Sequence, residues 1–172
     1  INEILTMPLG HSQFQFKNGA GFFEDISLSE IMETVVKKIA PLARQKNIVI
    51  NNKVKNYNLK GDKQGLTELF VILLDNAVKY SKKNSPVFLT SNKTDSVVNI
   101  EVSDEGQGIK EEDIPHIFDR FYRVDKARSK EKITGYGLGL SIARKIVEMH
   151  GGSINATSAL GKCTKFTVSL PA

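Results

Sequence analysis

One stretch of the chain, Leu66–Ser81, constrains the fold most, because it reads as a single helix with two different faces. Its apolar residues recur at helical spacing and predict a buried face: Leu66, Leu69, Phe70, Leu73 and Ala77. A second line of side chains repeats every four residues: Glu68, Ile72, Asn76 and Tyr80. With Lys79 beside it, this line suits either an ordinary polar surface or a wall that meets a phosphate and a metal ion. The apolar Ile72 does not fit the second interpretation.

Composition narrows the class of protein. The 172 residues are 40% hydrophobic, which predicts one globular domain with a real core, or one domain with a short extra piece. No apolar run reaches the ~18 residues that span a bilayer, and the N-terminal residues do not read as a signal peptide. The single cysteine, Cys163, cannot form an internal disulfide, so a reducing, cytoplasmic compartment is expected.

The net charge of +5 raises the question of nucleic-acid binding. The densest basic stretch, Arg120–Lys132, is interrupted by Asp125 and Glu131. A basic loop near a nucleotide explains this stretch at least as well as a DNA-binding face, and we expect no nucleic-acid partner.

Hydrophobic periodicity predicts the other elements. Helices are expected at Leu28–Lys46, capped by Ser27 or Ser29, and from Gly135 to His150, burying Leu138, Ile142, Ile146 and Met149. A short helix from Lys110 would bury Ile114, Ile117, Phe118 and Phe121. Strands are expected at 48–52, 87–91, 97–103, 153–158 and 164–170, with Asn56–Lys60 as a loop, Asp62 as a helix cap and 92–96 as a turn. Because the strands come late and are joined by hairpins, this order predicts an α+β fold, a two-layer sandwich.

Two glycine-rich segments carry chemical information. GYGLGL, Gly135–Leu140, opens a helix, where glycines let the backbone approach phosphate oxygens and the first N–H groups lack partners. DEGQGI follows a strand, so Asp104 could accept a hydrogen bond from a base amino group while Gly106 and Gly108 let a flat ring approach. The alternative for DEGQGI is a tight turn with a capping aspartate. The Rossmann and Walker patterns are absent.

Five segments in order resemble the boxes of the ATP-binding catalytic domain of bacterial sensor histidine kinases, in the superfamily of DNA gyrase and MutL. They are DNAVKYS, DEGQGI, FDRFYRVD, GYGLGLSIARKIVEMHGG and GKCTKFTVSLP, and the likeness covers about Phe23 to Pro171. The resemblance implies a Bergerat-type ATP-binding fold, in which a mixed, mostly antiparallel sheet is covered on one face by about three helices.

The resemblance also implies roles for individual residues. Asp104 would hold the adenine amino group, Ile109 and Thr164 would lie near the base, and Asn76 would bind Mg²⁺. The candidates for catalysis are Glu68, Lys79, Arg120 and Arg123. The remaining candidates for nucleotide binding are Tyr80, Gly106, Gly108, Phe121, Gly135, Tyr136, Gly137, Leu138, Gly139 and Leu140. Phe121 to Tyr136 would be the ATP lid.

The chain departs from the family pattern at two positions and lacks one part. Ile72 stands where the first box usually has an asparagine, and Cys163 where the last box often has a glycine. No histidine precedes an acidic residue, so the phosphoacceptor is expected on a separate dimerisation domain. Residues 1–22 would be the end of a dimerisation helix plus a linker, and residues 23–172 the catalytic domain.

The expected function is therefore binding of Mg-ATP and donation of the γ-phosphate to that histidine, for relay to a response regulator receiver domain. The fragment is expected to be a monomer, cut from a homodimeric, membrane-anchored sensor. The alternative is a nucleotide-binding pseudokinase module with weak transfer because of Ile72. A serine kinase of the same superfamily is disfavoured by the long lid and the FDRFYRVD segment.

Overall fold

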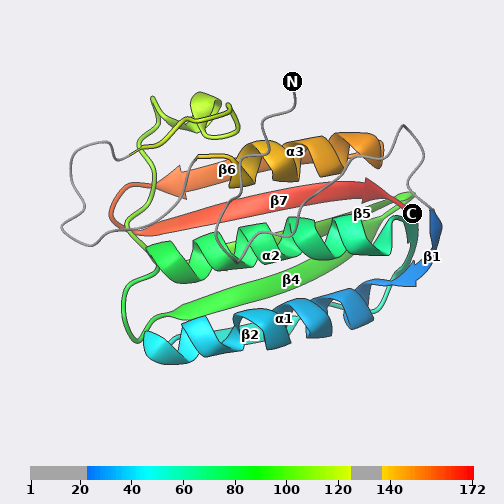
Figure 1. The fold of residues 1–172 in the computed structure, drawn as a ribbon, viewed down its shortest axis with the longest axis horizontal. Coiled ribbons are helices and arrows are strands. Elements are labelled where there is room, and N and C mark those ends of the chain that lie inside the picture. Colours follow the sequence, from blue (N-terminus) through cyan, green and yellow to red (C-terminus); the bar gives the residue numbers. More distant parts are fainter. Residues whose placement is uncertain (1–22, 125–136) are drawn as a thin grey trace, which may run out of the picture.

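The computed structural model describes residues 23–124 and 137–172, which form two layers (Figure 1). One layer holds three helices: α1 (Leu28–Gln45), α2 (Lys63–Tyr80) and α3 (Gly139–Met149). The other is a five-stranded sheet in the order β2 (Val49–Lys53), β4 (Pro86–Thr94), β5 (Val97–Asp104), β7 (Cys163–Pro171) and β6 (Ser153–Ala159). Only the β2–β4 pair within this sheet is parallel. The predicted α+β two-layer sandwich is confirmed.

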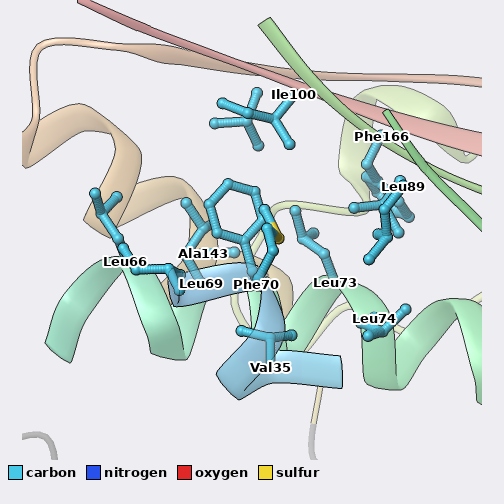
Figure 2. Packing of buried hydrophobic residues seen from close by; sticks show 14 of the residues in the cluster. Val35, Leu66, Leu69, Phe70, Leu73, Leu74, Leu89, Ile100, Ala143 and Phe166 are labelled. Atoms are coloured by element: carbon cyan, nitrogen blue, oxygen red, sulfur yellow. The ribbon is translucent and has the colours of Figure 1, made fainter. Parts of the chain in front are cut away.

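Helix α2 is the centre of the core, because it packs between α1 and α3 and against the sheet (Figure 1). Phe70 points from α2 towards Ile100 of β5, with Leu66 and Leu73 on either side (Figure 2). The predicted apolar face of α2 is buried throughout. The expected caps are confirmed as well: Asp62 accepts a hydrogen bond from the Gln64 N–H, and Ser27 from the Glu30 N–H.

The N-terminal part of the described chain was predicted incompletely. Asn56–Lys60 was expected to be a loop, but Asn58–Gly61 forms strand β3, which pairs with β1 (Glu24–Ser27) in a small antiparallel sheet. Both strands are only four residues long, and each has few alternating apolar residues. Periodicity cannot detect such strands, because the pairing partner supplies the signal.

Two other elements differ from their predictions. The expected helix after Lys110 is only a 3₁₀ turn, η1 (Ile114–His116), and Phe121, expected in its buried stripe, is 67% exposed with φ of 65°. Pro115 favours this short form, since proline suits only the first turn of a helix. Helix α3 begins at Gly139 instead of Gly135, and its buried residues are Ala143, Ile146 and Val147, whereas Met149 is exposed.

The topology gathers four chain segments at one end of the sandwich, on the left in Figure 1. They are the C-terminal ends of β5 and α2, the N-terminal end of α3, and the turn between β6 and β7. Gly106 and Gly108 follow β5, and Gly137 and Gly139 lie at the start of α3, so the described parts of both glycine-rich segments lie at this end. None of the helices within the described ranges is long and apolar enough to cross a membrane.

The core predicts a sharp contrast between two leucines. Leu73 is fully buried on α2, whereas Leu160 is 62% exposed in the β6–β7 turn. We expect Leu73→Ala to lower the free energy of unfolding by about 2–5 kcal/mol, because it leaves a cavity beside Phe70. Leu160→Ala should change it by less than about 0.5 kcal/mol. Urea denaturation of both variants measures the difference, and equal losses would contradict this description of the core.

Candidate functional site

Asp104 ends β5 and is the most unusual polar residue of the described chain. Its side chain is only 4% exposed, and the Gly106 N–H donates a hydrogen bond to the carboxyl group. Its Oδ1 atom is buried and has no hydrogen-bond partner among the described residues. Burial raises the pKa of Asp104 from 3.8 to about 6, although the Gly106 N–H and the charge of Lys46 lower it. A buried acceptor without a partner points to a donor supplied by a ligand.

The two glycines after Asp104 leave no room for a side chain. A Cβ atom on Gly106 would lie 2.2 Å from the Tyr80 carbonyl oxygen and 2.5 Å from Asp104 Oδ1. Gly108 has φ of 68°, and a Cβ there would lie 2.2 Å from the Ala159 carbonyl oxygen. The loop is therefore pressed against the end of α2 on one side and the β6–β7 turn on the other. Both glycines are therefore needed where the loop contacts the protein's own backbone, and the predicted approach of a flat ring to them stays a prediction.

Thr164 lies opposite Asp104 in the register of β5 and β7 and is 6% exposed. Its hydroxyl is 3.0 Å from that of Ser158 on β6. Ser158 Oγ also accepts a hydrogen bond from the Ile109 N–H at 2.8 Å and donates one to the Cys163 carbonyl. This network fixes Ile109 relative to Thr164, the two residues expected beside a base. Sequence reasoning missed Ser158, because only the register of the hairpin places it there.

The polar line on α2 is present, and its members differ in exposure. Glu68 and Asn76 are half-buried, and Tyr80 is 38% exposed. Lys79 pairs with Asp75 at 2.5 Å, so its ammonium is held along the helix. The Asn76 amide oxygen suits Mg²⁺, a hard ion that takes few protein ligands and fills its shell with water and phosphate oxygens. The described residues contain no cluster of three or more His, Cys, Asp or Glu side chains that would hold a metal.

Ile72 connects α2 to α3. Its Cγ2 atom would lie 3.3 Å from a Cβ atom added to Gly139, the first residue of α3, and its side chain is half-buried against the core. The apolar residue within the polar line is thus a packing contact between two helices. The asparagine expected there by resemblance would place an amide at this joint.

The start of α3 has the features of an anion site. The N-cap residue Leu138 makes no side-chain capping hydrogen bond, so the first N–H groups, including those of Gly139 and Leu140, are left to other partners. Gly137 has φ of 70°, and its carbonyl accepts a hydrogen bond from the Phe121 N–H at 2.9 Å. The two stretches that flank residues 125–136 therefore meet at this point.

The other predicted residues of this region fall into two groups. Arg120 and Arg123 are exposed in the segment after η1. Gly135 and Tyr136, together with most of the predicted lid, lie outside the described residues. The proposed roles of all four remain predictions.

Known proteins resemble this chain in sequence and in architecture. Residues 61–172 match the family of histidine kinase-, DNA gyrase B-, and HSP90-like ATPases. The signal transduction histidine-protein kinase ArlS of Staphylococcus aureus is 46% identical over 114 residues, which are 66% of this chain and 25% of ArlS. The chain thus spans about a quarter of the length of that relative.

Solved structures extend the likeness. The catalytic domain of histidine kinase ThkA matches with a TM-score of 0.75 at 27% identity, covering 87% of this chain and 95% of that one. Full-length ShkA in complex with AMPPNP matches with a TM-score of 0.77 at 25% identity, covering 87% of this chain and 31% of that one. ThkA in complex with the response regulator protein TrrA matches with a TM-score of 0.71 at 25% identity, covering 87% of this chain and 41% of that one.

The raised pKa of Asp104 predicts how stability depends on pH. The native state holds the Asp104 proton more tightly than the unfolded state, so its contribution is full below 3.8 and is lost as pH rises through about 6. We expect the wild type to lose about 2–3 kcal/mol of unfolding free energy relative to Asp104→Asn as pH rises from about 4 to about 7. Urea denaturation across this range tests the difference, and a constant offset between the two proteins would contradict it.

Proposed function

Because the chain belongs to the family of histidine kinase-, DNA gyrase B-, and HSP90-like ATPases, we propose that it binds Mg-ATP and donates the γ-phosphate to a histidine on a separate dimerisation domain. The observation that carries this proposal is the buried Oδ1 of Asp104, an acceptor without a partner beside a glycine-lined loop. Adenine has a matching donor in its amino group. A guanine base has an oxygen at that position, which a carboxylate repels.

The base end of the site is formed by side chains that are already held in place. The Asp104 carboxylate accepts a hydrogen bond from the adenine amino group. Thr164 lies opposite Asp104 on the neighbouring strand β7. Ile109, fixed through Ser158, packs on the ring. These groups bind and orient the base and take no part in the transfer.

The phosphate end depends on backbone groups and charges. The uncapped N–H groups of α3 face the phosphates with the positive end of the helix dipole. Asn76 would hold Mg²⁺, which neutralises phosphate charge when bound. Glu68, two turns earlier on the same line of α2, would act on the proton of the attacking imidazole, and Arg120 and Arg123 would approach the transferred phosphoryl group. Such transfer requires mostly positioning and charge stabilisation.

The same proposal extends to the partners and the location. ThkA has been solved with a response regulator, and ShkA with an ATP analogue. We infer that this domain works within a homodimeric parent kinase, for relay to a receiver domain on the cytoplasmic side of a membrane-anchored sensor. Residues 1–22 would connect it to the dimerisation helices.

Nucleotide titration tests the binding step. We expect the chain to bind ATP with Mg²⁺ in a calorimetric titration, and Asp104→Asn to weaken binding about 10- to 100-fold, as for loss of a hydrogen bond to a charged group. Asp95→Asn in the exposed β4–β5 turn is the matched control and should bind normally. Absence of binding by the wild type at millimolar ATP would overturn the proposal.

Transfer is tested by mixing the chain with a purified dimerisation domain and labelled ATP. Label on the histidine of that domain is the expected result. Label on a serine substrate instead would identify the other kinase class of this superfamily.

Ile72 favours a second candidate, a nucleotide-binding module with weak transfer. An apolar side chain between Glu68 and Asn76 cannot ligate Mg²⁺ or bond to its water shell. We expect Ile72→Asn to raise the transfer rate severalfold and to strengthen the dependence on Mg²⁺, with Ile72→Val as the apolar control. If Ile72→Asn transfers no faster than the control, the side chain at this position does not limit the reaction.

A further inference from the structure

Lys46 joins the ends of two helices. It is the C-cap residue of α1 and is half-buried. Its Nζ donates hydrogen bonds to three carbonyl oxygens at the C-terminal end of α2: Val78 at 2.9 Å, Lys79 at 2.6 Å and Ser81 at 2.8 Å. The geometry uses all three donors of an ammonium group.

These bonds complete the end of α2. The last four carbonyls of any helix lack partners within the helix. In α2, Ser81 satisfies the Ala77 carbonyl through its N–H and its hydroxyl, and the Gln107 N–H satisfies the Tyr80 carbonyl. The other two carbonyls, those of Val78 and Lys79, accept hydrogen bonds from the Lys46 ammonium. Two of the four terminal carbonyls of α2 therefore depend on one side chain, whose positive charge also complements the negative end of the helix dipole.

The end of α2 is in turn the support of the Asp104 loop. Ser81 pairs with Gly106 in an isolated β-bridge, and the Lys82 N–H approaches the Glu105 carbonyl at 3.5 Å. The Tyr80 carbonyl blocks the space where a side chain at Gly106 would lie. Any shift in this end of α2 would therefore move the loop that carries Asp104.

We propose that Lys46 is a positioning residue of the nucleotide site, which fastens the end of α2 against the Asp104 loop and keeps the Asp104 carboxylate ready to accept the base amino group. The inference rests on the proposed nucleotide function. It adds a residue that lies in none of the five family-like boxes and about 30 residues before the first of them in sequence.

The surroundings of Asp104 explain why one lysine matters. The residues opposite Asp104 in the register of the two neighbouring strands are neutral: Val87 on β4 and Thr164 on β7. Lys79 on α2 is paired with Asp75, and Glu105 is exposed. The Gly106 N–H and, after it, the charge of the Lys46 ammonium lower the pKa of Asp104 against the effect of burial. Removing the Lys46 charge favours the protonated acid, which is a poorer acceptor.

The first experiment needs no nucleotide. The Asp104 carboxyl is titrated by carbon-detected NMR in the wild type, Lys46→Met and Lys46→Arg. Because the positive charge of Lys46 lowers the pKa of Asp104, Lys46→Met should raise that pKa by up to about one unit, and Lys46→Arg, which keeps the charge, should not. Lys38→Met, an exposed lysine on the same helix, is the matched control. An unchanged pKa in Lys46→Met would overturn the electrostatic role.

The second experiment measures ATP affinity for the same proteins at several pH values. Protonation of the ATP phosphates changes the Kd of every variant in the same way, so it does not affect the ratio of the variant Kd to the wild-type Kd. For Lys46→Met this ratio should exceed one at about pH 8 and rise about fivefold further by about pH 6. For Lys46→Arg the ratio should stay flat with pH, and for Lys38→Met it should stay near one.

The outcomes separate the two proposals. If the wild type binds no ATP, the proposed function is overturned. If the wild type binds ATP and Lys46→Met binds it with the same affinity, this inference alone is overturned. A ratio above one that does not vary with pH would show a purely structural role and would also overturn it. Thermal unfolding monitors folding, and if Lys46→Met is unfolded, Lys46→Gln provides a neutral variant that retains two N–H donors.

Discussion

The rest of the site depends on one constraint: the Asp104 carboxyl group is buried at the end of β5. Burial opposes the charge of Asp104, and within the described part of the chain the Gly106 N–H and the Lys46 ammonium oppose the effect of burial. A buried ionisable group with a raised pKa is characteristic of functional sites. The glycine loop contacts the end of α2 and the β6–β7 turn, and Oδ1 of Asp104 is left without a partner among the described residues.

The same constraint explains why α2 is central. Its apolar face fills the core, its N-terminus is capped by Asp62, and its C-terminus is closed by groups from α1 and from the Asp104 loop. Helix, loop and strand therefore share one set of hydrogen bonds. A rigid helix carrying Asn76 and Tyr80 is positioned by the same contacts that position Asp104.

Long periodic elements were predictable from the sequence, and elements defined by their partners were not. The buried face of α2 and the alternation of β5 are local patterns, and the structure matches both. Strands β1 and β3 exist because they pair with each other, and Phe121 left its predicted stripe because the chain turns there to meet Gly137. Asp104, Gly106 and Gly108 could be singled out because their residue types are unusual after a strand. Ser158 and Lys46 could not, since a serine in a strand and a lysine after a helix are common, and only tertiary contacts give them a role.

Ile72 shows how a departure from a family pattern gains meaning from packing. The sequence places it within a polar line and suggests a defect, whereas the structure places its side chain against the start of α3. That contact joins the helix that carries Asn76 to the helix whose first N–H groups are proposed to face the phosphates. The base end of the site is held by side-chain hydrogen bonds, but the phosphate end is held by how closely two helices pack. Substitutions at Asp104 or Ser158 should therefore act on which base is bound, and substitutions at Ile72 or Gly139 on where its phosphates lie.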